Sequence, residues 1–245
     1  MAKKQTLYQI LRKTGMFATK EELIDALRNG KVAIDGRVTK NQKFQLNPNT
    51  KIVTVEGVKI EILPLRYFII NKPERTSCQN GEHRSYVRDL IPVDAVGEAV
   101  FNSLFCVGRL DVPTTGLLII TNDGSFSSKI LKPESGILKK YKVKIKDPID
   151  QVQINILKRG VDIILKDGNY HSCLPAKVEK LHDHELLISI TEGKFRQVRK
   201  MLEAVGNLVV SLERIAIGGL ELGDLDLRKF KELTSEEIKE KVFSN

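Results

Sequence analysis

Two hydrophobic periodicities follow one another in the first quarter of the chain. Apolar residues recur at helical spacing over residues 6–13 and 19–29, which predicts two amphipathic helices. Thr19 and Glu22 have the spacing of a capping box at the start of the second helix. After residue 30 apolar and polar positions alternate, and Asp-Gly at 35–36 and Glu-Gly at 56–57 predict hairpin turns. The sequence therefore predicts a helix pair followed by β-hairpins.

A second series of apolar runs starts at residue 63. Strands are predicted over residues 63–73, 104–107, 117–121, 141–145, 161–165, 186–191 and 208–217, and helices over 125–131, 148–159 and 195–205. The irregular spacing and frequent tight turns favour an α+β fold with a mixed, mostly antiparallel sheet over a doubly wound one. Gly218-Gly219 lies within a strand-like pattern and is expected to form a bulge. We predict two domains, residues 1–62 and 63–245.

Composition and charge narrow the class of protein. The 245 residues are 41% hydrophobic and 29% charged, which is typical of a folded globular chain. The formal net charge is +9, and the first 62 residues hold 12 of the Lys and Arg against 6 of the Asp and Glu. A polyanionic partner is favoured, although such cations can also form an ordinary solvated face. The N-terminal candidates for phosphate contacts are Arg12, Lys20, Arg28, Lys31 and Arg37.

Several classes of site are not expected. The three cysteines are widely spaced and odd in number, so no disulfide framework is predicted. His182-Asp183-His184 lacks a partner set for a metal, and we expect no metal site. No Gly-rich phosphate loop indicates a cofactor, and no signal peptide or membrane-spanning apolar run is found. A cytoplasmic protein without a membrane partner is expected, with a monomer as the default.

Three stretches carry candidate chemistry. Asp111 follows Arg109 between two apolar runs, although a loop aspartate often only bonds its own backbone. Tyr141 opens a predicted strand, where a tyrosine is commonly a core residue. Four cations, Lys194, Arg196, Arg199 and Lys200, crowd the first turns of a predicted helix, where they oppose its dipole. Such a cluster calls for a carboxylate or a phosphate nearby.

The N-terminal segment resembles a known RNA-binding module. The stretch LYQILRKTGMFATKEELIDALRNGKVAIDGRVTK is similar to the S4-type domain, whose pattern is helix, Gly, helix and then G-x-V-x-V-N/D-G. The resemblance implies that the helix pair lies on structured RNA, with cations that contact phosphates and position the protein. Phe17-Ala18-Thr19 departs from the Ser-Arg that relatives often carry, which removes one expected phosphate contact.

Four later motifs resemble the pseudouridine synthases of the ribosomal small-subunit synthase A type. They read GRLDVPTTGLLIITNDG, KKYKV, EGKFRQVRKM and RIAIGGLEL. The resemblance implies an isomerase that acts on ribosomal RNA without a cofactor. It assigns Asp111 as the catalytic aspartate, Tyr141 as the active-site tyrosine and Arg199 as the ion-pair partner of the aspartate. The remaining motif positions, expected to shape the site or hold RNA, are Arg109, Thr115, Lys140, Lys194, Arg196 and Gln197.

The implied chemistry fits these residue types. Conversion of uridine to its C-glycoside breaks the N1–C1′ bond and joins C5 to the sugar, through either nucleophilic attack by a carboxylate or a glycal. A tyrosine can stack on the flipped base and assist removal of the C5 proton. Arg196 replaces the usual His, and KPERTSCQN departs from the commoner Lys-Pro-x-Gly run. A non-catalytic ribosome-assembly factor is the alternative, while a metal-dependent nuclease lacks the clustered acids. The target uridine and the ribosomal subunit stay open.

Overall fold

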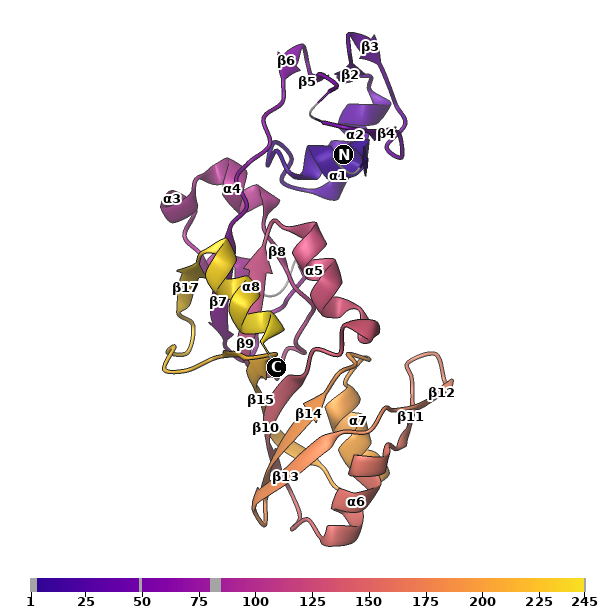
Figure 1. Cartoon of the computed structure of the whole chain (residues 1–245), viewed down its shortest axis with the longest axis vertical. Helices are drawn as coiled ribbons and strands as arrows, with labels where there is room; N and C mark the ends of the chain where they lie inside the picture. Colours follow the sequence, from indigo (N-terminus) through magenta and orange to yellow (C-terminus); the bar gives the residue numbers. More distant parts are fainter. Residues whose placement is uncertain (1–3, 49, 80–84, 245) are drawn as a thin grey trace. The chain divides into compact units, whose positions relative to one another are not determined.

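The computed structural model describes residues 4–48, 50–79 and 85–244 (Figure 1). The chain forms two compact units. The first comprises Met1–Leu65 and Ile91–Phe105, and the second comprises Arg66–Leu90 and Cys106–Asn245. This division differs from the predicted one at 62/63 because a later segment, 91–105, joins the N-terminal unit.

The predicted N-terminal helix pair is confirmed. Helix α1 (Leu7–Arg12) is capped by Thr6, and α2 (Lys20–Arg28) by Thr19, whose hydroxyl accepts a hydrogen bond from the Glu22 amide. The Glu22 carboxylate accepts from the Ala18 amide at 2.9 Å. Only half of the predicted capping box therefore forms, because the glutamate reaches one residue further back. Two short helices, α3 (Val93–Val96) and α4 (Glu98–Ser103), complete this unit.

Hairpins follow the helix pair as predicted. The four-stranded sheet has the order β3-β2-β5-β6, and a separate pair joins β1 to β4. The turns at 35–36 and 56–57 are confirmed, since Asp35 and Glu56 have φ of 47° and 50°, each followed by a positive-φ glycine. The strands are β1 (Gln5–Thr6), β2 (Val32–Ile34), β3 (Arg37–Val38), β4 (Gln45–Leu46), β5 (Val53–Val55) and β6 (Val58–Lys59).

The second unit is built on one large sheet. Its main path is β13-β14-β10-β15-β9-β7-β17, with β16 on β15 and β8 on β9. Among the described strands of this path, β15 and β9 are parallel and the other neighbours antiparallel, which confirms the mixed, mostly antiparallel α+β fold. The strands are β7 (Tyr67–Lys72), β8 (Phe105–Cys106), β9 (Thr115–Thr121), β10 (Lys139–Ile145), β13 (Lys177–His182), β14 (Glu185–Ile190), β15 (Val209–Ile217), β16 (Leu220–Glu221) and β17 (Phe230–Leu233).

Helices cover this sheet in two groups. Helices α5 (Gly124–Leu131) and α8 (Ser235–Phe243) lie over β7 and β9, where Phe126 packs edge-on against Tyr67 and Phe243. Helices α6 (Gln151–Arg159) and α7 (Gln197–Ala204) lie at the other end, beside β13 and β15 and a small hairpin of β11 (Asp162–Ile164) and β12 (Tyr170–Ser172). Two 3-10 turns, η1 (Val87–Leu90) and η2 (Pro133–Ser135), complete the unit.

Some elements differ from the sequence prediction. Strands β12, β13 and β17 and helix α8 were not predicted, because their exposed residues blur the apolar pattern. The predicted bulge at Gly218-Gly219 is wrong: these glycines are the two-residue turn between β15 and β16. A Cβ at Gly218 would lie 1.9 Å from the Val242 carbonyl oxygen, so helix α8 leaves no room for a side chain. No helix within the described residues is long and apolar enough to cross a bilayer.

Gly116 allows the parallel contact between β9 and β15. Its φ is 99°, and a Cβ there would lie 2.3 Å from the Arg214 carbonyl oxygen. We expect Gly116→Ala to lower the unfolding free energy by about 3 kcal/mol, through backbone strain plus a backbone clash. Gly136 has a φ of 65° and open space around it, so Gly136→Ala should cost only about 1–2 kcal/mol. Urea unfolding of both variants measures the difference, and equal losses would contradict this role of Gly116.

Candidate active site

Asp111 lies on the loop between β8 and β9, at the wall of a hollow of about 690 Å³. The loop is folded by a turn in which the Thr114 amide donates to the Asp111 carbonyl at 3.0 Å. On the other side of Asp111, the Leu110 amide donates to the Cys78 sulfur at 3.3 Å. The half-buried aspartate also lines a second, smaller hollow that Tyr141 and Gln197 share. Asp111 is therefore a half-buried residue that borders both hollows.

The amine of Lys72 donates hydrogen bonds to the backbone of the loop that carries Asp111. The residue is fully buried at the end of β7, and its amine donates to the carbonyls of Pro73 at 2.9 Å, Val112 at 3.3 Å and Thr114 at 2.8 Å. Burial lowers the pKa of Lys72, and the nearby Cys78, Asp111 and Glu74 oppose that effect. Sequence reasoning missed this lysine, although a Lys-Pro pair at the end of an apolar strand was its visible signal. Lys72 fixes both residues that flank Pro113.

Arg199 supports the same loop from helix α7. It is 7% exposed, and its guanidinium donates to the Pro113 carbonyl at 3.3 Å and the Val209 carbonyl at 3.5 Å. The expected direct ion pair with Asp111 does not form between these two described residues. Burial and Arg196 lower the pKa of Arg199, while Asp111 acts to raise it, which places the carboxylate within electrostatic range. The arginine contacts the backbone of the loop and attracts Asp111 at longer range.

Tyr141 enters the site from β10. It is 8% exposed and faces Ile188 on one neighbouring strand and Arg214 on the other. The register with β15 shifts between Lys140 and Tyr141, and such irregularities re-aim side chains. Arg214 is itself buried and donates to the Leu117 carbonyl at 2.7 Å. The sequence had singled out the tyrosine but not this second buried arginine.

The lysine that lines the larger hollow is Lys139 rather than the predicted Lys140. Alternation along β10 buries Lys139, whose amine donates to the Thr191 carbonyl at 2.7 Å, and turns Lys140 away. Burial and the nearby Arg214 lower the pKa of Lys139 to about 8. A one-residue difference along a strand moves a side chain to the opposite face, and the motif pattern alone did not decide which lysine faced inward.

The loop 192–196 forms another wall and carries two cations. Lys194 and Arg196 line the hollow, and neither makes an ion pair within the described part of the chain. Arg196 has a φ of 54°, which points the chain into α7. Gln197 is buried and donates to Glu192 at 2.9 Å while accepting from the Lys194 amide at 2.9 Å. Gln197 therefore braces the loop, whereas the cations stay available to a ligand.

Of two more predicted residues, Arg109 and Thr115, only the first lines a hollow. Arg109 lines it and donates to Gln79 at 2.9 Å on the exposed side. Thr115 begins β9 opposite Glu213 and lies outside the lining of both hollows.

Of the histidine-rich turn 182–184, Asp183 pairs with Lys180 at 2.8 Å and His184 bonds the Lys146 carbonyl at 3.1 Å.

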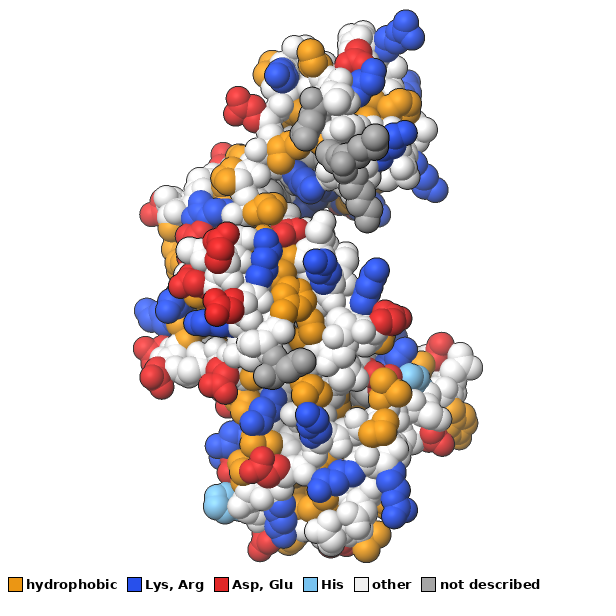
Figure 2. All heavy atoms as spheres, in the orientation of Figure 1, with side chains coloured by type: hydrophobic (Ala, Val, Ile, Leu, Met, Phe, Trp, Pro, Cys, Tyr) orange, Lys and Arg blue, Asp and Glu red, His pale blue; other side chains and the backbone are white. Residues whose placement is uncertain are grey.

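The predicted N-terminal cations are distributed over their own unit. Lys31 pairs with Glu56 at 2.7 Å and Arg28 with Asp25 at 3.7 Å, while Arg12 donates to the Phe17 carbonyl at 3.3 Å. Lys20 and Arg37 are exposed and make no ion pair within the residues described. Figure 2 shows Lys and Arg side chains spread around the visible face of this unit rather than gathered in one patch.

Comparison with known proteins decides the family. Residues 66–204, which hold Asp111, Tyr141 and Arg199, match the model of the family described as RNA pseudouridylate synthase. The chain belongs to this family. It is 33% identical over 90% of its length to the ribosomal small subunit pseudouridine synthase A of Vibrio cholerae, of which it covers 92%. An uncharacterised RNA pseudouridine synthase of Bacillus subtilis is 35% identical, over 95% of this chain and 96% of the relative.

A solved structure agrees in fold. A crystal structure of a pseudouridylate synthase superposes with a TM-score of 0.68 and 31% identity, and the match covers 97% of this chain and 99% of the other. The protein is thus an isomerase of the RNA pseudouridine synthase family. The family model does not include residues 1–65, and it therefore does not test the S4-type resemblance of the N-terminal unit.

Proposed function

We propose that this pseudouridine synthase isomerises a specific uridine of ribosomal RNA, with Asp111 as the catalytic carboxylate. The observation that carries the proposal is the clamped loop: Lys72 and Arg199 bind its backbone and thereby fix Asp111 at the wall of a hollow lined by cations. The relatives named as ribosomal small subunit synthases support ribosomal RNA as the substrate class. The enzyme would act as a cytoplasmic monomer.

The reaction is internally balanced. The N1–C1′ bond breaks, the uracil turns and C5 bonds to C1′, while the C5 proton is lost and a proton is gained at N1. Asp111 either attacks C1′ as a nucleophile or removes a ribose proton to give a glycal, and both routes use the same ionised oxygen. Because the target base must leave its stack to reach this loop, we infer that the hollow receives a flipped nucleotide.

The neighbouring side chains have complementary roles in this proposal. Tyr141 stacks on the uracil or helps remove the C5 proton, since it shares the smaller hollow with Asp111. Arg109, Lys194 and Arg196 line the larger hollow, where they meet the phosphates that flank the flipped base. Arg199 positions the loop and stabilises negative charge on Asp111.

We further propose that the N-terminal unit is an S4-type module that binds structured RNA. Its helix pair and hairpins follow the expected pattern, and Lys20 and Arg37 are free to contact phosphates. Lys31 and Arg28 reach RNA only by exchanging an acidic partner for a phosphate. This unit contributes affinity that depends on salt rather than on base sequence.

Reversal of the two free cations tests the module. We expect Lys20→Glu/Arg37→Glu to weaken binding of all structured RNAs by roughly tenfold or more and to reduce the slope of log affinity against log salt by about 2. The control is Lys229→Glu/Lys241→Glu, which makes the same charge change at exposed sites of the second unit. Filter binding over a salt series measures both. Equal losses in the two variants would mean that net charge, not this module, governs binding.

A non-catalytic RNA-binding factor, the alternative drawn from the sequence, would give a different result in an activity assay. It predicts RNA affinity without product, whereas the proposed enzyme releases tritium from RNA labelled at C5 of uridine. Wild-type protein that binds ribosomal RNA tightly yet releases no tritium, with both ribosomal subunits offered as substrate, would favour the binding factor.

A further inference from the structure

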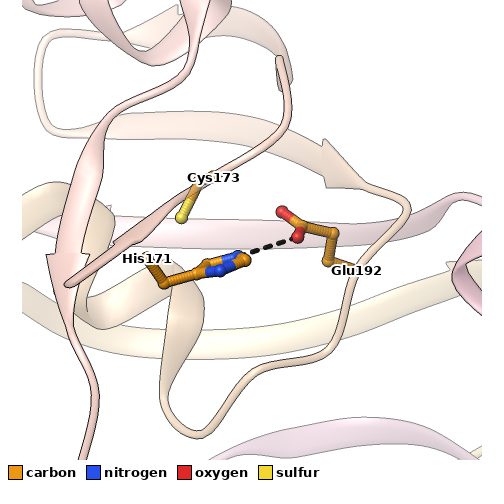
Figure 3. A group of neighbouring side chains, drawn as sticks. All are labelled: His171, Cys173 and Glu192. Atoms are coloured by element: carbon orange, nitrogen blue, oxygen red, sulfur yellow. Dashed lines mark hydrogen bonds and ion pairs between the residues drawn. The ribbon is translucent and has the colours of Figure 1, made fainter. Parts of the chain in front are cut away.

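A cluster of three donor side chains lies outside the residues assigned to the reaction. His171 in β12 and Cys173 just after it face Glu192, which follows β14 (Figure 3). The donor atoms of the imidazole, thiol and carboxylate all lie within 4.8 Å of one another. Figure 3 shows the three side chains converging on one space, with the His171–Glu192 hydrogen bond along one side. No other such group of three occurs among the described residues.

The charge of this cluster favours a cation. Glu192 is 7% exposed and Cys173 is 6% exposed, and the only ion-pair partner of Glu192 among the described residues is His171. Its other hydrogen-bond donors among the described residues are the Leu174 amide and the Gln197 side chain, both of which are neutral. The carboxylate is thus buried beside two neutral donors and one histidine, and a bound cation would supply the full positive charge that these groups do not provide.

The hydrogen bonds to Glu192 are divided between its two oxygens. Oε2 accepts from the Leu174 amide at 2.8 Å and from Gln197 at 2.9 Å, whereas Oε1 faces His171 Nε2 at 2.9 Å. In metal-binding carboxylates, hydrogen-bond donors from the surrounding protein typically hold one oxygen while the other oxygen faces the ion. The supporting groups of such a site are therefore already in place.

We propose that His171 Nε2, Cys173 Sγ and Glu192 Oε1 bind one zinc ion. Imidazole, thiolate and carboxylate are the usual donors to zinc, at about 2.0–2.3 Å, and small side-chain rotations bring three atoms this close into a tetrahedral set. The mixture with sulfur and nitrogen argues against magnesium or calcium, which take oxygen ligands. Water occupies the fourth position on the side where the His171 side chain is 21% exposed.

Binding replaces protons by the ion. Without metal, Cys173 is a free, buried cysteine. Zinc binds the thiolate, the thiol proton leaves to solvent, and the ion takes the place of the His171–Glu192 hydrogen bond. The Nε2 proton that His171 shares with Glu192 leaves to solvent, and Nδ1 carries one proton, so the imidazole bound to the ion is neutral. The ion adds two positive charges to one thiolate and one carboxylate, which leaves the site electrically balanced.

The proposed ion joins two segments of the second unit. It connects β12 to Glu192, which begins the loop that carries Lys194 and Arg196 along the larger hollow. A bound ion would replace the His171–Glu192 hydrogen bond and add to the one that the Leu174 amide donates to Glu192. The site itself does not depend on the reaction proposed above, because its residues are distinct from the catalytic candidates.

Cobalt titration of the chelator-treated full chain tests the proposal. We expect one equivalent of Co²⁺ to give the near-ultraviolet thiolate-to-cobalt band and the strong visible bands of four-coordinate cobalt, both abolished by one equivalent of Zn²⁺. Cys173→Ser should lose the near-ultraviolet band and bind at least ~10-fold more weakly. Cys78→Ser, which removes another buried thiol of the same unit, should keep the band.

His171→Gln supplies a second variant at a less buried position, in case Cys173→Ser does not fold. It should weaken cobalt binding by a similar factor, and added Zn²⁺ should raise the Tm of the wild type but not of this variant. A folded wild type that gives no thiolate band with Co²⁺, or a band that survives in Cys173→Ser, would overturn the site and leave a hydrogen-bonded cluster only. Either result is independent of pseudouridine formation.

Discussion

Asp111→Asn is expected to abolish pseudouridine formation while the protein stays folded and binds RNA. The amide is nearly the same size as the carboxylate but can neither attack C1′ nor accept a ribose proton. Loss of a nucleophile or base typically lowers turnover by several orders of magnitude, so we expect a fall of at least ~10³-fold. Tritium release from RNA labelled at C5 of uridine measures the turnover, and filter binding measures the affinity.

Asp123→Asn is the matched control within the same motif. Asp123 caps α5 through the Ser125 and Phe126 amides and accepts from the Tyr67 hydroxyl at 2.8 Å. Asparagine still caps the helix through Oδ1, but an amide nitrogen replaces the oxygen that accepts from Tyr67, so the Tm should fall and turnover per folded molecule stay unchanged. The proposed mechanism fails if Asp111→Asn retains wild-type turnover, or if both variants lose activity in proportion to lost fold.

Lys72→Met is expected to lower both turnover and stability. Methionine fills a similar volume but leaves the carbonyls of Pro73, Val112 and Thr114 without their donor. Buried acceptors that lose a charged donor destabilise a protein by about 3 kcal/mol in all. The loop then shifts, and a displacement near 1 Å at a reacting group costs roughly 10²-fold in rate.

The readouts distinguish positioning from general damage. Because Lys72 contacts the loop and lies outside both hollows, kcat should fall while KM for RNA changes little. Lys142→Met removes a partly exposed lysine paired with Glu185 and should alter stability by less than about 1 kcal/mol and leave kcat unchanged. A Lys72→Met enzyme with wild-type kcat would show that the loop holds Asp111 without this amine.

The hydrophobic pattern was sufficient for most of the fold. Helical spacing predicted α1 and α2, and branched apolar runs predicted β7, β9, β10 and β15, because burial of one face or of a whole strand leaves a periodic trace. Strand β13 and helix α8 left a weaker trace, since most of their residues face solvent. Gly218-Gly219 was misread because the pattern does not show that the chain reverses there to clear α8.

The residue types of the candidate site could be predicted from the sequence, but the contacts between these residues could not. Motif order singled out Asp111, Tyr141 and Arg199 by their residue types, because a chemical role restricts the identity of a side chain. Their mutual arrangement required the folded sheet: Arg199 binds the Pro113 carbonyl rather than Asp111, and Lys139 rather than Lys140 lines the hollow. Spacing along the sequence determines neither contact. The inward direction of Lys139 depends on strand register, and the Arg199 contact depends on which helix lies beside the loop.

The sequence by itself determined many of the elements, the family resemblance and the identity of the candidate catalytic aspartate. Only the tertiary structure revealed the Lys72 clamp and the meeting of His171 and Cys173 with Glu192. These contacts join residues about 20 to 40 positions apart, which the sequence pattern cannot pair. Periodicity records which side of an element is buried, whereas contacts between elements depend on how the whole sheet brings those sides together.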